Sequence, residues 1–374
     1  MRRRVWRLDG KEASSGEPLS VLCAAGGQTR NYLAHLLFDD KGGREHDLGR
    51  VWLWQLSSSR WVRKRDCSLV FIQADPFLQR FLDQDDWFFI PLWISGTVKL
   101  PVSDHVLKSK SMRSDVRRIE EAGLQGRVTR DPERFDDFYH NMYVPHVTKA
   151  HGSSVYVNPY DTMRTRLEDG DLVLIRDGEQ DIAGMMIVYD HDRPRLWSAG
   201  VRNGDHRHLD RGALTAVYRF SCDHLARKGF DSASMGLSRP FLKDGVLRYK
   251  RKWAQKIVGS VPDRIALKVV GDTHVTGAFL RNNPFIFESS GELQGAVFLS
   301  EQDALHPDTA RRMKKLYFHD GVSRLILFSP HAEAARDGSL LPAAVAFHHC
   351  DHLGRRSARN LRFVASAPRR GHKA

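Results

Sequence analysis

The chain has 374 residues, 41% of them hydrophobic and 28% charged, a balance that excludes a globally disordered protein, and the length predicts two or three domains. Lys and Arg number 58 against 45 Asp and Glu, which gives a net charge of +13 at pH 7. A positive field of this size attracts polyanions such as CoA, nucleotide-linked sugars, tRNA, DNA or anionic lipid, but it does not choose among them.

Cysteine spacing and the lack of long apolar runs predict where the protein resides. The four cysteines lie far apart and form no CxxC pair, so we expect reduced, mostly buried thiols. Asp9, Lys11 and Glu12 interrupt any signal-peptide pattern after the first arginines. Nowhere do about 18 apolar residues run together, so we predict a cytoplasmic protein without a membrane span.

The first part of the chain predicts a flexible N-terminus over 1–18 and an α/β region over 19–105. In that region, apolar runs between turn signals predict strands at 51–54, 68–72 and 87–94. Asp75 followed by Pro76 is typical of the start of a short helix, which we expect over 75–82.

The middle part, 106–265, has a clear α/β rhythm. A charged segment over 108–122 predicts a helix that ends at Gly123, and Asp131 with Pro132 starts a second. Strands are expected at 172–176, 182–189 and 195–201, then a helix at 212–228 and a strand at 230–235. These elements predict one compact mixed α/β domain.

The last part predicts an accessory α/β region over 266–352 and a basic disordered tail over 353–374. Strands are expected at 265–270 and 324–328, with a basic helix at 309–317 between them. The tail is Arg-rich and poor in core residues, so it could touch anionic lipid or nucleic acid, or only aid solubility.

The segment 204–213 joins a strand to a helix and carries Arg207, Arg211 and Gly212. Backbone N–H groups and the helix dipole at such a position favour a bound phosphate. This segment resembles the pyrophosphate loop of the GNAT superfamily, Arg/Gln-x-x-Gly-x-Gly/Ala, with Asp210 in the place of the first glycine. The alternative is ordinary capping of the helix.

A second segment, 236–253, contains a Gly-x-Ser strand end, a Lys-Asp-Gly turn and an aromatic-Lys-x-x-aromatic run. It is similar to the end of the GNAT-like domain in Fem-type peptidyl aminoacyltransferases and their exopolysaccharide-associated acetyltransferase relatives. The charged helix at 112–124 is also similar. The resemblance covers about 108–265 and implies a GNAT-like mixed sheet flanked by helices, with 19–105 as a reduced first domain of a tandem pair.

The resemblance implies direct transfer of an acyl group from acetyl-CoA or another acyl-CoA to an amine or amino sugar in envelope or exopolysaccharide assembly. Lys250 matches the family's lysine, which binds charge on the substrate or intermediate; a solvated lysine in a basic run is the alternative. The implied CoA-binding residues are Ala199, Val201, Arg207, Arg211, Gly212 and Ala213. The implied acceptor-binding residues are Tyr139, Tyr143, His151, Arg239 and Lys243, although aromatic residues at helical spacing more often pack in a core.

Two other functions stay open. A Fem-type enzyme would take its acyl group from charged tRNA, which suits the positive charge, although no heptad arm for tRNA appears. A non-catalytic nucleic-acid-binding protein is the third, without a recognisable motif. We expect no metal, because the run His348–His352 places its potential ligands next to one another rather than in separated pairs. The oligomeric state is left open.

Overall fold

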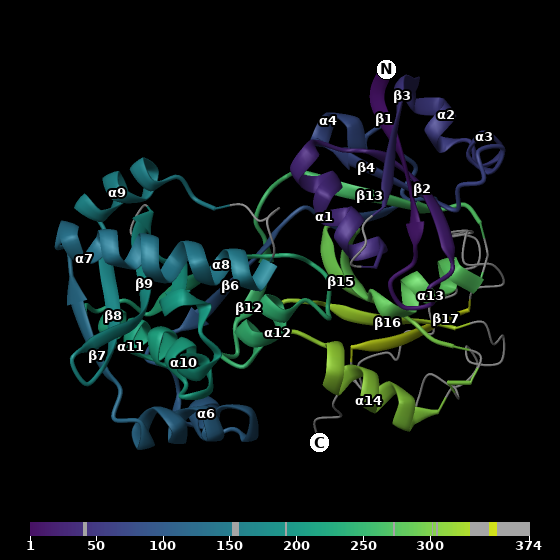
Figure 1. Cartoon of the computed structure of the whole chain (residues 1–374). Helices are drawn as coiled ribbons and strands as arrows, with labels where there is room; N and C mark the ends of the chain where they lie inside the picture. The colour runs from purple at the N-terminus through teal and green to yellow at the C-terminus, as the bar shows by residue number, and fades with distance from the viewer. Residues whose placement is uncertain are drawn as a thin grey trace, which may run out of the picture. The chain divides into compact units, whose positions relative to one another are not determined.

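Contacts within the chain group it into two units (Figure 1). The computed structural model describes residues 1–39, 43–151, 157–190, 193–271, 274–300, 302–303, 306–329 and 344–349, with only the backbone of His151 and His349. The first unit comprises Met1–Ile94, Arg239–Leu247 and the described part of Gly259–Ala374. The second comprises Ser95–Ser238 and Arg248–Val258.

The first unit is built on a ten-stranded mixed sheet in the order β17-β16-β15-β14-β5-β13-β4-β2-β1-β3. Its strands are β1 (Arg2–Lys11), β2 (Pro18–Ala24), β3 (Arg44–Trp52), β4 (Leu69–Ala74), β5 (Phe88–Pro91), β13 (Arg264–Val269), β14 (Phe285–Ser289), β15 (Glu292–Phe298), β16 (Arg324–Ser329) and β17 (Val345–His349). Its helices are α1 (Gly27–Leu37), α2 (Leu53–Ser57), α3 (Ser59–Arg63), α4 (Pro76–Gln79), α13 (His274–Asn282) and α14 (Pro307–Tyr317).

Strand β1 lies where the sequence predicts a flexible terminus, so the structure differs there. β1 pairs antiparallel with both β2 and β3, and a register shift between Arg4 and Trp6 marks a bulge at Val5. Val5 and Leu8 are fully buried, in two different clusters of the core. Two apolar anchors and two hydrogen-bonded neighbours order this charged segment.

Strand β13 also departs from the predicted organisation. It pairs antiparallel with β4 on one side and β5 on the other, so residues near the expected boundary at 265 lie inside the sheet of the N-terminal region. Lys268 of β13 is buried, and its Nζ donates to Asp86 Oδ2 at 2.7 Å and Ser57 O at 2.9 Å. The N- and C-terminal regions therefore share one sheet.

The second unit has a seven-stranded mixed sheet in the order β12-β6-β11-β10-β9-β8-β7. Its strands are β6 (Ile94–Lys99), β7 (Gln125–Thr129), β8 (Asp171–Asp177), β9 (Gln180–Asp190), β10 (Arg193–Val201), β11 (Ser232–Ser238) and β12 (Lys256–Gly259). Its helices are α5 (Asp104–Leu107), α6 (Lys110–Glu121), α7 (Pro132–Asp137), the π-helix η1 (Phe138–Tyr143), α8 (Val144–His151), α9 (Tyr160–Glu168), the 3₁₀ turn η2 (Arg202–Gly204), α10 (His206–Asp210) and α11 (Ala213–Arg227), and α12 (Gly245–Arg251) ends in it.

Both faces of this second sheet are covered, because successive side chains of its strands pack on opposite faces. Val173 and Ile175 of β8 pack in one cluster with α6 and α11, whereas Leu172 and Leu174 pack in another with η1 and α9. This is the two-residue period of a strand buried on both faces. Two mixed sheets flanked by helices confirm the predicted mixed α/β fold.

Candidate functional site

Strand β10 of the second unit lies between an antiparallel neighbour, β9, and a parallel one, β11. Against β9 the register passes from Leu196 opposite Ile187 to Ser198 opposite Met186, so Trp197 is an extra residue in a bulge. Against β11 the described residues form one parallel pair, Arg195 with Ser234. Beyond that pair, N–H groups of β10 that face β11 have no ladder partner in the described structure and can donate to a ligand. The predicted Ala199 and Val201 lie on this stretch.

Helix α11, the longer of the two α-helices after β10, begins without a capping side chain. Its N-cap, Gly212, has φ of +89°, and the first turn of α11 contains no acidic residue. A Cβ at Gly212 would lie 3.1 Å from Ile119 Cγ1 and 3.4 Å from the Asp115 carbonyl oxygen, so α6 packs against this end of α11. The predicted Ala213 is buried there. Glycine is required by both the left-handed φ and the close approach.

The segment predicted as an open loop contains the short helix α10. The Asp205 carboxylate starts it by accepting a hydrogen bond from Arg207 N at 2.9 Å. The exposed Arg207 guanidinium (87%) donates to the same carboxylate at 2.6 Å, and hydrogen bonds from Arg207 lower the pKa of Asp205 to about 2. Arg211 pairs with Asp177 at 3.0 Å. Both arginines predicted to bind phosphate are therefore paired with carboxylates.

Lys250 of α12 is buried (4% exposed) rather than solvated. Its Nζ donates to Leu237 O at 2.8 Å and to Ser238 Oγ at 3.1 Å. Gly236 of β11 has φ of +70°, and its Cβ position would lie 3.9 Å from this Nζ and 2.9 Å from Leu196 O. The ammonium group thus lies near the point where β10 and β11 meet.

The predicted Tyr139 and Tyr143 lie in η1, which packs against β10. Tyr139 Oη donates to Asn158 O at 2.9 Å, and Tyr143 Oη accepts from Asn158 Nδ2 at 2.9 Å. The same Nδ2 donates to Ser198 Oγ, 3.1 Å away, just after the bulge. Both rings are buried in the core, where they fix Asn158 beside β10. The side chain of His151, which ends α8, lies outside the described residues.

Arg239 and Lys243, also predicted to bind substrate, belong to the first unit. The Arg239 guanidinium lies between the rings of Tyr32 and Trp93, and Lys243 Nζ donates to Asn282 Oδ1 at 3.0 Å. Burial lowers the pKa of both groups. The residues predicted to bind the acceptor therefore belong to two different units.

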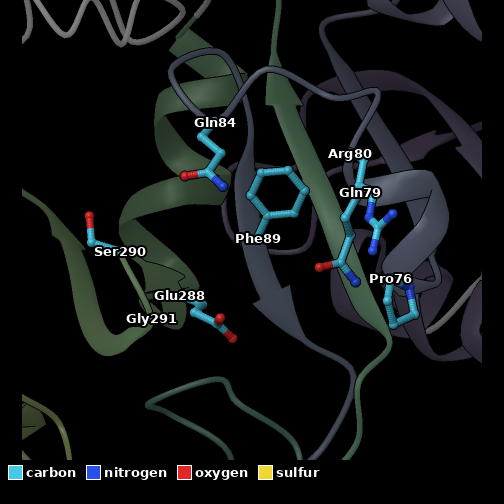
Figure 2. A pocket seen from close by; sticks show the side chains of 8 residues that line it. All are labelled: Pro76, Gln79, Arg80, Gln84, Phe89, Glu288, Ser290 and Gly291. Atoms are coloured by element: carbon cyan, nitrogen blue, oxygen red, sulfur yellow. The ribbon is translucent and has the colours of Figure 1, made fainter.

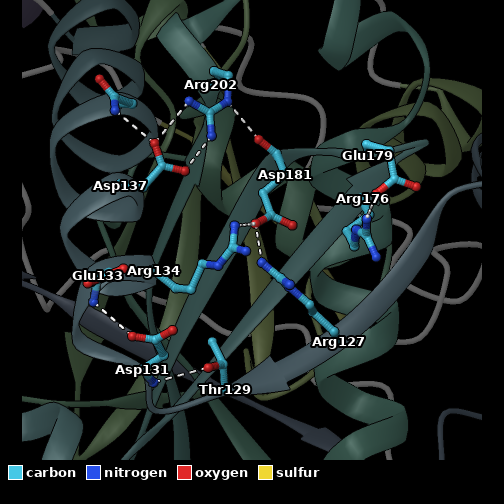
Figure 3. Close-up of polar contacts among 11 residues, drawn as sticks. Arg127, Thr129, Asp131, Glu133, Arg134, Asp137, Arg176, Glu179, Asp181 and Arg202 are labelled. Carbon is cyan, nitrogen blue, oxygen red and sulfur yellow. Dashed lines mark hydrogen bonds and ion pairs between the residues drawn. The ribbon is translucent and has the colours of Figure 1, made fainter.

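An ion-pair network that the sequence did not indicate lies at the end of β10 (Figure 3). The buried Asp181 carboxylate pairs with Arg127 and, at 3.2 Å, with Arg134. Arg202, directly after β10, donates to Asp181 O at 2.6 Å and forms a bidentate pair with Asp137. This network links β7, α7, β9 and the start of η2, and so fixes the exit of β10. No local motif could have revealed it, because its partners come from four elements.

A shallow depression of about 260 Å³ lies in the first unit (Figure 2). Its lining residues are Pro76, Gln79, Arg80, Gln84, Phe89, Glu288, Ser290 and Gly291. Gln79 Nε2 donates to Ala74 O at 3.0 Å and Pro262 O at 2.9 Å, and Glu288 pairs with Arg264 at 2.5 Å. These side chains are engaged in holding the walls, so the depression offers few groups for chemistry.

The described residues show neither a metal-binding cluster nor a membrane-spanning helix. In that part of the chain, no group of three or more His, Cys, Asp or Glu side chains could hold a metal ion. His348 contacts the Phe328 ring with centroids 5.2 Å apart, while Cys350, Asp351 and His352 lie outside the described residues. None of the helices described has the length and apolar character to cross a bilayer.

No family model matches this chain, and neither does any curated protein. Among solved structures it is similar to the C-terminal domain of a putative lysylphosphatidylglycerol synthetase from Agrobacterium fabrum (13% identity, 74% of this chain and 83% of that chain, TM-score 0.35). It is also similar to FemX (11%, 70% and 84%, 0.36) and to a GCN5-related N-acetyltransferase from Kribbella flavida (10%, 87% and 84%, 0.28). Similarity this distant leaves the activity of this chain open.

Proposed function

We propose that this chain is an acyltransferase that transfers an acyl group directly to an amine, with the reacting carbonyl beside the bulge of β10. The observation that carries the proposal is the interrupted pairing of β10. Trp197 is unpaired against β9, and β11 pairs only at Arg195 in the described structure. Backbone donors held rigidly along a strand suit the negative charge that develops on a carbonyl oxygen under attack.

In the proposed reaction the amine nitrogen attacks the donor carbonyl, and the oxygen gains negative charge. Those N–H groups of 197–201 that face β11 rather than β9 would stabilise that oxygen. When the tetrahedral intermediate collapses, the bond to the donor's leaving group breaks, and the leaving group takes up the proton that the amine nitrogen gives up. Lys250, buried close to Leu196, would contribute positive charge near the intermediate.

We propose acyl-CoA as the donor, with its pyrophosphate at the N-terminus of α11. Arg207 and Arg211 would exchange Asp205 and Asp177 for phosphate oxygens. Exposed ion pairs of this kind contribute little to stability, so the exchange costs little. The acceptor remains the predicted amine or amino sugar.

A charged-tRNA donor is the second candidate, and one observation favours it. The arginines of the α11 end are already neutralised, and α6 packs against Gly212, so a pyrophosphate has less room than at an open loop. The net charge of +13 suits a tRNA partner, which needs no pyrophosphate site.

Calorimetric titration with acetyl-CoA tests the donor. We expect micromolar binding that weakens about tenfold or more when Arg207 and Arg211 are both replaced by Ala, because two charge-assisted contacts are lost. Replacing two other exposed arginines, Arg113 and Arg227, removes the same charge and should change the affinity less than about twofold. A folded wild-type protein that does not bind acetyl-CoA would exclude this donor, and charged tRNA would be titrated next.

The lysine is tested separately once a turnover assay with the bound donor exists. Lys250→Met should lower kcat about 100-fold while donor affinity stays within about twofold, because the ammonium acts on charge formed during the reaction. Lys256→Met, an exposed lysine of β12, is the control and should have wild-type kcat. Equal kcat in both variants would remove Lys250 from the proposed chemistry.

A further inference from the structure

Arg239 is a buried cation held between two aromatic rings of the first unit. The side chain is 9% exposed, and its Cζ lies 4.0 Å from the centroid of the Tyr32 ring and 3.6 Å from that of the Trp93 ring. One hydrogen bond anchors it, from Nη1 to Leu92 O at 3.3 Å. The rings of Tyr32 and Trp93 therefore contact the guanidinium through its π-faces.

The rest of the guanidinium lacks a protein partner. A guanidinium carries five N–H donors and stays charged. Within the described residues, neither Nε nor Nη2 of Arg239 has a hydrogen-bond acceptor, and no carboxylate forms an ion pair with it. Burial raises the pKa of Tyr32, so that ring remains a neutral phenol and cannot neutralise the arginine. No nitrogen of Arg239 is among the buried side-chain atoms of the described residues that lack a partner, so these N–H groups reach the surface, where a ligand can meet them.

We infer that Arg239 binds the carboxylate or phosphate group of a ligand through the edge of its guanidinium. Two rings on the faces leave the edge, where Nε and Nη2 present parallel N–H donors. This is the geometry that a carboxylate or phosphate accepts in a bidentate pair. Stacking also fixes the orientation of the fork before the ligand arrives, which lowers the entropic cost of binding.

Charged residues of the same segment complete the surroundings of Arg239. Lys243 follows Arg239 on the same segment, and burial lowers its pKa. Asp244 is the one acid whose charge acts on Arg239, and its Oδ1 is held by Leu247 N at 2.9 Å. The site extends the prediction that Arg239 binds substrate, and it does not depend on acyl transfer.

Nuclear magnetic resonance of the full chain labelled with ¹⁵N-arginine tests this site directly. The Arg239 Nε–H signal, assigned through its own backbone connectivities, is followed while inorganic phosphate is added in one series and succinate in another, at constant ionic strength. We expect a saturable shift in at least one series, and the series that shifts it shows whether the ligand group is a phosphate or a carboxylate. The Nε–H signal of Arg50, exposed on β3, should not saturate.

Variants add an independent measurement by calorimetry with the same two anions. Arg239→Gln should weaken binding about tenfold or more, Arg239→Lys should also weaken it because lysine lacks the fork, and Arg50→Gln should change it less than about twofold. If Arg239→Gln does not fold, the wild-type spectrum still decides. An Arg239 signal that neither anion moves, or that moves no more than that of Arg50, overturns the inference.

Discussion

Four donors converge on the carboxylate of Asp171 in the second unit. His224 Nε2 lies 2.9 Å, Lys228 Nζ 3.0 Å and Arg130 Nε 3.1 Å from its oxygens, and Tyr189 Oη also donates to it. Burial raises the pKa of Asp171, but these hydrogen bonds outweigh burial and hold the pKa well below its usual range. The cluster joins β8 and β9 to the end of α11, so it stabilises the frame of the candidate site.

Replacing this carboxylate tests that role. Asp171→Asn should lower the free energy of unfolding by about 2 kcal/mol at pH 7, because the buried carboxylate loses its charge-assisted hydrogen bonds. A depressed pKa in the folded state stabilises above the unfolded pKa, so the difference from wild type should be full above about pH 4 and shrink as the pH falls below it. Urea unfolding at several pH values measures both effects.

The control for this experiment is Asp169→Asn, an exposed carboxylate at the C-cap of α9. It should change the unfolding free energy by less than about 0.5 kcal/mol at every pH. A loss in Asp171→Asn that stays constant from pH 7 to below pH 4 would contradict the pKa argument.

Single residues also mark the limit of what the sequence predicts. Position in a motif indicated Lys250, but its burial and its contact with Leu237 O depend on packing of α12 against β11. Arg239 was indicated in the same way, yet the rings that hold it, Tyr32 and Trp93, come from distant parts of the sequence. When the environment of a side chain is formed by residues distant in the sequence, no local sequence pattern can predict it.

At the scale of elements, η1 and β10 approach each other more closely than side chains would allow. A Cβ at Gly200 would lie 2.5 Å from both Met142 C and Tyr143 N, so only glycine lets the π-helix rest on the strand. The sequence predicted a helix here, started by Asp131 and Pro132, but not its π form. Packing onto β10 distinguishes the two forms, and π turns often occur at functional sites.

Adding one methyl group at this contact should be destabilising. Gly200→Ala should lower the free energy of unfolding by roughly 2–3 kcal/mol, because the backbone of η1 or of β10 must move to make room. Gly259→Ala, at a strand position with open space around its Cβ, should change it by less than about 1 kcal/mol. Chemical denaturation of both variants gives the comparison, and equal stabilities would mean that the contact is easily relaxed.

The hairpin elements agree with the sequence where turn chemistry is strong. The expected strands at 172–176, 182–189 and 195–201 correspond to β8, β9 and β10, because the turn at Asp177-Gly178 is encoded locally. Helix α10 was not expected, although the capping carboxylate of Asp205 was visible in the sequence. The divergence of β10 from β11 could not be read at all, since pairing is set by the whole sheet.

The whole molecule shows why the predicted boundaries and the structure differ. Sequence patterns identify elements but not their partners, and β13 lies between β4 and β5 although other residues of the chain separate them. Phe88 of β5 contacts the rings of Phe285, Phe287, Phe298 and Phe328 from the C-terminal region. The core of the first unit therefore needs both ends of the chain.

A fragment covering 1–105 tests this dependence. Of the ten-stranded sheet it carries β1 to β5 but none of β13 to β17, so both β4 and β5 lose a central neighbour and Phe88 loses its aromatic partners. We expect no cooperative thermal transition in circular dichroism, because too little apolar surface is buried to offset chain entropy. The full chain is the control. A sharp melting transition in the fragment would mean that its five strands suffice for a stable core.

The segment Arg239–Leu247 belongs to the first unit, although the residues on both sides of it in the sequence belong to the second. This arrangement limits which parts of the chain can be exchanged by recombination. The backbone of the segment bonds to β14 and its flank, from Leu242 N to Pro284 O and from Ile286 N to Pro240 O, each at 2.7 Å. If 95–258 were exchanged as one block between related genes, the new 239–247 segment would have to pack against the β14 of the original chain. Recombination should therefore succeed mainly when 239–247 and 284–286 are exchanged together or already have compatible sequences. Substitutions in these two distant stretches are therefore expected to be correlated.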